Sequence, residues 1–146
     1  MVDVYSTIEI SRSPADLARF ASDPDNAPTW YVNIKSVEWE TEPPAVLGSR
    51  IAFVAHFLGK KMAYTYELAE LEPGARMVMR TSEGPFPTET TSRFEENESG
   101  GTTMGLRNRG EPSGFAKITA PLMVGAMRRA NRKDLELLKS ILEAQA

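Results

Sequence analysis

The feature that most constrains the fold of this chain is one long amphipathic helix near its C-terminal end. Apolar side chains recur at helical spacing over residues 115–142, and basic residues interleave with them. Pro121 falls inside this pattern, so we expect the helix to start or kink near Ala120 and to run to about residue 144. Such a helix would be roughly 36 Å long. Its apolar stripe must be buried, so the rest of the chain has to supply a broad apolar face.

The preceding residues read as strands. Apolar and polar residues alternate along Val2–Ile10, and the same period returns after residue 34. Glycine and proline mark the breaks, and the short loops predict antiparallel neighbours. The expected later strands are residues 34–42, 49–58, 61–72, 75–83, 87–96 and 102–110.

Two short helices are expected between the first two strands. Ser13 is a good N-cap, Pro14 suits the first helical position, and Asp16 can return a hydrogen bond to the cap. Asp23-Pro24 opens a second helix running towards Trp30. The pattern therefore predicts one α+β domain over residues 1–146, with a seven-stranded antiparallel sheet wrapped around the long C-terminal helix.

Composition excludes several classes of chemistry. The chain has no cysteine and one histidine, so disulfides, thiolate metal sites and sites that need two imidazoles are ruled out. We expect no metal and no cofactor. A net charge of −3 disfavours nucleic acid as a partner. The first residues show no basic segment and no long apolar run, so we expect neither a signal peptide nor a membrane span, and a cytoplasmic protein.

The single histidine, His56, is the one side chain whose ordinary pKa suits acid–base work near neutral pH. On its strand, Ile51, Phe53, Ala55 and Phe57 form the bulkier apolar face. If that face points inward, His56 points outward, away from any cavity. Contact with a ligand remains the alternative.

Several side chains favour a cavity that is apolar with polar tips. Tyr64 and Tyr66 share a strand face and could offer hydroxyls to a ligand, or simply fill the core. Ser92 and Asn108 sit on strand faces where a cavity or solvent would each explain a polar residue. The predicted ligand-binding residues are Trp30, Phe53, Tyr64, Tyr66, Ser92, Met104, Asn108, Leu122, Met123 and Met127.

Four stretches carry a resemblance to a known family. They are residues 23–39, the strand opening at 48–51, the strand and turn at 66–73, and residues 100–104 followed by the helix that ends at 134–139. In these stretches the chain resembles the START/Bet v 1-like (SRPBCC) superfamily, and within it the polyketide cyclase/dehydrase-like branch. The resemblance implies a helix-grip fold and covers nearly the whole chain.

The resemblance leaves the function open, because a fold does not choose a function. Members bind lipids, sterols, polyketides or hormones, cyclise aromatic polyketides, or act as co-chaperones. Binding of a small hydrophobic or aromatic ligand between sheet and helix is our first interpretation, and no catalytic residue is assigned. A polyketide cyclase/dehydrase-type enzyme is the alternative, and it would need His56 paired with a tyrosine. A protein-interaction module using the sheet edge or Arg128, Arg129 and Arg132 is the third, and a homodimer is left open.

Overall fold

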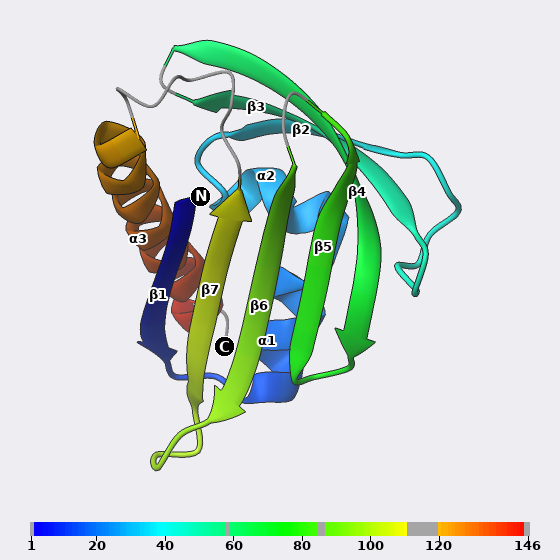
Figure 1. Cartoon of the computed structure of the whole chain (residues 1–146). Helices are drawn as coiled ribbons and strands as arrows, with labels where there is room; N and C mark the ends of the chain where they lie inside the picture. The colour runs from blue at the N-terminus through cyan, green and yellow to red at the C-terminus, as the bar shows by residue number, and fades with distance from the viewer. Residues whose placement is uncertain (1, 58, 85–86, 111–119, 145–146) are drawn as a thin grey trace.

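The computed structural model describes residues 2–57, 59–84, 87–110 and 120–144. In chain order, one strand precedes three short helical segments, then come six strands and a long helix (Figure 1). The elements are β1 (Val2–Ile10), α1 (Pro14–Ala21), η1 (Pro24–Asn26), α2 (Ala27–Trp30), β2 (Ile34–Trp39), β3 (Arg50–Phe57), β4 (Lys60–Glu72), β5 (Arg76–Glu83), β6 (Thr88–Glu96), β7 (Thr102–Gly110) and α3 (Ala120–Ala144).

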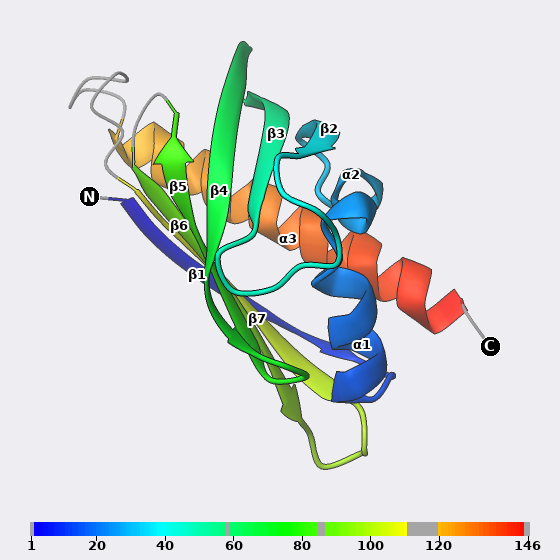
Figure 2. The ribbon, with the colours of Figure 1, turned by 90° about the vertical axis from the view of Figure 1, so that its right-hand side faces the viewer.

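The seven strands form one antiparallel sheet in the order β1-β7-β6-β5-β4-β3-β2. Register shifts on the long strand β4, between Thr65 and Tyr66 and between Leu68 and Glu70, interrupt its pairing with β5. Irregularities of this kind bend a strand and increase its twist. The sheet curves accordingly, and α1, α2 and α3 all lie on its concave side (Figure 2).

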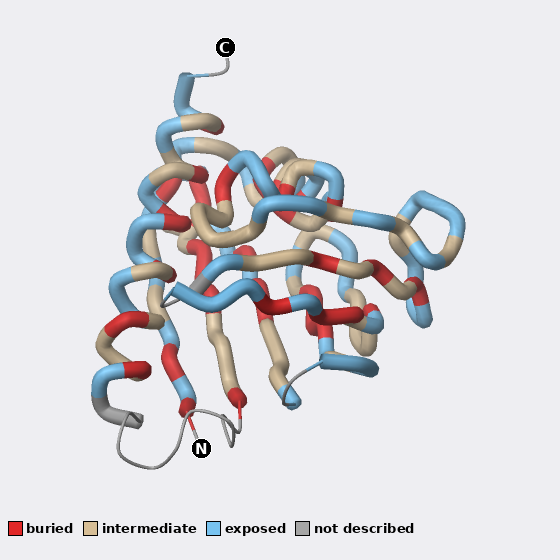
Figure 3. The backbone as a smooth tube through the Cα atoms, turned by 90° about the horizontal axis from the view of Figure 1, so that it is seen from above, coloured by how far each residue is buried: buried red, intermediate tan, exposed pale blue. Residues whose placement is uncertain are grey.

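The long helix is held by its apolar stripe. Leu135, Leu138 and Leu142 are almost fully buried and pack in one cluster with residues of the first and last strands. Buried and exposed residues alternate along α3 with the helical period (Figure 3). The prediction that this helix packs along the concave face of a seven-stranded sheet is confirmed. The other buried members of the cluster are Ile10, Leu17, Ala18, Ala21, Trp30, Phe94, Met104 and Leu106.

The first strand and the last helix are also tied together by hydrogen bonds. Lys139 Nζ donates to the Glu9 carbonyl oxygen at 2.7 Å, and Arg12 Nη1 donates to the Leu142 carbonyl oxygen at 2.8 Å. Along its other edge, β1 pairs with β7 over its whole length. These hydrogen bonds join residues about 130 positions apart in the chain, and they fix the C-terminal half of α3 against the end of β1.

The local predictions hold closely. Ser13 caps α1 by accepting from the Asp16 backbone N–H at 3.2 Å, and β1 and β7 have the predicted bounds. The second short helix is divided into a 3₁₀ turn and one α-helical turn. The described part of the long helix runs from Ala120 to Ala144. The part of the predicted stripe before it, with Phe115 and Ile118, lies outside the described residues, as does the Phe57 side chain.

Candidate functional site

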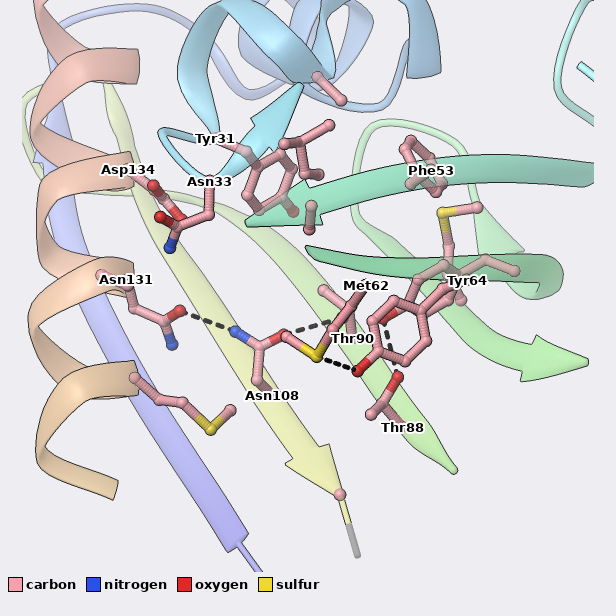
Figure 4. A pocket seen from close by; sticks show the side chains of 18 of the residues that line it. Tyr31, Asn33, Phe53, Met62, Tyr64, Thr88, Thr90, Asn108, Asn131 and Asp134 are labelled. Carbon is pink, nitrogen blue, oxygen red and sulfur yellow. Dashed lines mark hydrogen bonds between the residues drawn. The ribbon is translucent and has the colours of Figure 1, made fainter. Parts of the chain in front are cut away.

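A cavity of about 210 Å³ lies between the sheet, the short helices and α3 (Figure 4). Its lining is mostly apolar and includes five methionines. Methionine side chains are flexible and polarisable, so a surface built from them can adapt to different shapes. The apolar lining residues are Val2, Ala21, Pro24, Ala27, Ile34, Phe53, Ala55, Met62, Met77, Met79, Met123, Met127 and Ala130, together with the rings of Tyr31, Tyr64 and Tyr66.

A chain of hydrogen-bonded side chains crosses the cavity lining from the sheet to the helix. The Tyr66 hydroxyl lies 2.8 Å from Thr88 Oγ1 and also hydrogen-bonds with Thr90. Thr90 Oγ1 donates to Asn108 Oδ1 at 2.8 Å, and Asn108 Nδ2 donates to Asn131 Oδ1 at 2.8 Å. Figure 4 shows Thr88 and Thr90 of β6, Asn108 of β7 and Asn131 of α3 around the cavity. They form a polar seam in a mostly apolar wall.

A buried carboxyl group, Asp134, lies one helical turn beyond Asn131 and also lines the cavity. Its Oδ1 accepts from the Val32 backbone N–H at 2.9 Å. Burial disfavours the charged form and raises the pKa of Asp134 to about 7, although the bond from Val32 acts in the opposite direction. Asp134 can therefore gain or lose a proton near neutral pH.

The three cavity tyrosines keep their protons at neutral pH. Burial raises the pKa of Tyr31, Tyr64 and Tyr66 above the ordinary value for a phenol. The Tyr64 hydroxyl contacts the Met62 sulfur at 3.2 Å, and Tyr31 hydrogen-bonds with Ser92. These hydroxyls can therefore act as hydrogen-bond donors but not as bases.

Six of the ten predicted ligand-binding residues line the cavity: Phe53, Tyr64, Tyr66, Asn108, Met123 and Met127. Ser92 lies just behind the lining and is 1% exposed. Trp30 and Met104 are fully buried in the main core. Trp30 was predicted to bind the ligand, but it stacks on Tyr31 with ring centroids 3.8 Å apart, and Tyr31 is the residue that lines the cavity.

The prediction that Leu122 lines the cavity is wrong, because its side chain is 73% exposed. Successive residues of an α-helix point about 100° apart. The helix turns Met123 and Met127 towards the sheet, and Leu122 consequently faces solvent. Apolar character alone did not identify its side of the helix.

The orientation predicted for His56 is confirmed. Its side chain is exposed, and β3 pairs with β4 without interruption from Arg50 to Phe57, so no bulge turns it inward. The histidine–tyrosine pair that an enzyme was expected to need is therefore not formed at the cavity. Within the described ranges, no group of three or more metal-ligating side chains occurs.

Sequence reasoning missed Asn33, Asn131 and Asp134 as cavity residues. A signal for the two helical residues was present. Asn131 follows Met127 by four positions, and Asp134 follows it by seven, so both fall in the apolar stripe. A polar residue inside such a stripe needs a partner or a function.

The chain matches one protein family over residues 1–143, described as polyketide cyclase/dehydrase and lipid transport. It belongs to this family. The match covers the whole sheet and almost all of α3, so the cavity lies within the family's shared fold. Family and fold together indicate a ligand-binding or cyclase-like protein of the START/Bet v 1-like superfamily. No curated protein sequence matches the chain.

Solved structures share the fold at low sequence identity. A protein from Thermus thermophilus superposes with a TM-score of 0.83 at 24% identity, covering 99% of each chain. A START superfamily protein from Mycobacterium smegmatis gives 0.82 at 13% identity, again over 99% of each chain. The di-domain ARO/CYC BexL from the BE-7585A biosynthetic pathway gives 0.75 at 19% identity, over 98% of this chain and 47% of that one. At these identities the likeness shows the fold. In the part of the chain that the structure describes, no helix is long and apolar enough to cross a membrane.

Proposed function

We propose that this protein binds a small, largely apolar molecule of one or two rings in the cavity between sheet and α3. The observation that carries the proposal is the cavity itself, about 210 Å³ with a mostly apolar lining. An apolar cavity of about 150 Å³ holds benzene, and pockets for drug-sized ligands measure about 300–1,000 Å³. The volume therefore favours a compact ligand, and the methionines favour tolerance of several shapes.

Two experiments test this proposal. Native mass spectrometry of the freshly purified protein should reveal a co-purifying small molecule, and the emptied protein should bind the two-ring fluorophore 1-aminonaphthalene. Ala130 lines the cavity from α3. Replacing it with leucine should fill part of the cavity and lower the affinity for 1-aminonaphthalene at least tenfold. Ala63→Leu, at an exposed position of β4, is the matched control. Absence of both a co-purifying molecule and fluorophore binding would refute the proposal.

A cyclase-type enzyme is the second candidate, and one observation favours it. Asp134 lines the cavity with a pKa of about 7, and general acid–base catalysis works best with a pKa near the operating pH. In this mechanism Asp134 would move the proton, with the neutral Tyr31 hydroxyl donating to a ketone oxygen. Incubation with a linear poly-β-ketone thioester and chromatography of the products tests it. Asp134→Asn should then return cyclisation to the spontaneous rate.

We also propose that residues 1–146 act as one domain in the cytoplasm without a nucleic-acid partner. The net charge of −3 gives a phosphate backbone no overall attraction. Light scattering during gel filtration would show whether the protein is a monomer or a homodimer. The open cavity favours ligand binding over a pure protein-interaction module, for which a filled core would suffice.

A further inference from the structure

One hydrogen-bond donor at the cavity has no partner. Asn131 lines the cavity from α3 and is only 4% exposed. Its Oδ1 accepts from Asn108, but its Nδ2 donates to no other atom among the residues that the structure describes. Buried amide groups are normally hydrogen-bonded, so an unpaired one at a ligand cavity indicates where a ligand atom binds.

The seam of hydrogen bonds fixes which edge of this amide is free. Thr90 donates its hydroxyl proton to Asn108 Oδ1, so Asn108 presents its Nδ2 group to Asn131. Asn131 must then accept with its oxygen, and its nitrogen is left facing the cavity (Figure 4). The Tyr66 hydroxyl hydrogen-bonds with Thr90 and can supply the donor at the start of the series. The ligand atom that meets Asn131 is therefore an acceptor.

The charges around the seam favour an uncharged acceptor. Arg109 is the one cationic residue in the described lining, and its guanidinium lies 3.8 Å from Asp3 and 3.9 Å from Glu89 in ion pairs. Asp134, one turn from Asn131, would repel an anion whenever it is ionised. A carboxylate ligand would thus lie close to the Asp134 carboxyl group, while the one cation in the described lining, Arg109, is already in ion pairs.

We propose that the ligand carries a neutral carbonyl oxygen, as in an aromatic ketone or a quinone, which accepts a hydrogen bond from Asn131 Nδ2 while its rings lie against Phe53 and the methionines. This inference rests on the proposed binding function and adds the chemical class of the ligand. Asn131 would then select for ligands with a carbonyl group by donating a hydrogen bond to the carbonyl oxygen.

A pair of compounds that differ in one group tests the inference. 1-Tetralone carries a carbonyl where tetralin carries a methylene, and both have two rings. Calorimetric titration of the wild-type protein should give tetralone about tenfold higher affinity than tetralin. Asn131→Leu should reduce this ratio to about two or less. Ala63→Leu, at an exposed position of β4 outside the cavity, should leave the ratio unchanged.

The infrared carbonyl stretch of bound tetralone provides a readout that does not need a variant. A hydrogen bond lowers the frequency relative to tetralone in a hydrocarbon solvent, and Asn131→Leu should restore it. Asn131→Leu leaves Asn108 Nδ2 unpaired and could fail to fold. In that case the carbonyl stretching frequency of tetralone bound to the wild-type protein tests the inference alone. Equal affinities for both compounds with an unshifted frequency would overturn the inference and leave the binding function standing. No binding of either compound would also overturn the inference, whereas the binding function is tested separately by the 1-aminonaphthalene titration.

Discussion

Asp134 offers the sharpest test of the site's electrostatics. Its pKa rises from 3.8 to about 7 in the fold, chiefly because burial penalises the charged form. Between these values the folded protein holds a proton that the unfolded chain has released. Stability should therefore fall as pH rises from about 4 to 7 and level off above. At about 1.4 kcal/mol per pH unit, the loss by pH 8 is about 4 kcal/mol.

The substitution Asp134→Asn removes the charge at nearly constant shape, and the new amide oxygen can still accept from the Val32 N–H. The variant should exceed the wild type in stability by up to about 4 kcal/mol at pH 8, and by less than half of that at pH 5. Urea unfolding monitored by tryptophan fluorescence measures both values, because Trp30 is fully buried in the folded state.

Glu136→Gln supplies the matched control, since Glu136 is an exposed carboxylate on the same helix. Its effect on the free energy of unfolding should be small and equal at the two pH values. The reasoning fails if the advantage of Asp134→Asn is the same at pH 5 and pH 8. That result would mean that burial does not hold the proton on this carboxyl group.

Three further predictions concern the fold and the exposed histidine. His56→Ala should leave 1-aminonaphthalene affinity within about threefold and change stability by less than about 1 kcal/mol; a larger change in either would contradict the strand orientation. Deleting residues 121–146 should abolish cooperative urea unfolding, because the core loses its helix; a folded truncated protein would refute this. Gly101→Ala should cost about 1–3 kcal/mol, since its Cβ would lie 2.6 Å from the Ile10 carbonyl oxygen; an unchanged urea midpoint would contradict the clash.

The faces of β3 were predictable from the sequence because one side of this strand is clearly the bulkier apolar one. The alternation around Phe53 places His56 outward without any knowledge of the partner strands. Helix faces were harder, since one residue of offset turns a side chain by about 100°. Leu122 and Met123 are both apolar neighbours, yet Leu122 is exposed to solvent and Met123 is buried.

The polar end of the cavity was predicted only in part. Asn108 was identified from its strand, but its partner Asn131 comes from a helix 23 positions later, and no local pattern pairs the two. The position of Trp30 likewise depends on how the short helices dock against α3 and the sheet. Such placements follow from long-range packing, which strand and helix periods do not encode.

β1 pairs with β7 and packs against α3, and these distant contacts limit the order in which the protein can fold during synthesis. β1 leaves the ribosome before the other six strands, but its strand partner follows only at residues 102–110, and the helix that packs on it follows from Ala120. Until then β1 is an unpaired edge, which invites association with other chains. Contacts this distant in sequence also form slowly. We expect the nascent chain to depend on chaperones until α3 emerges, and the cavity to be among the last features to form.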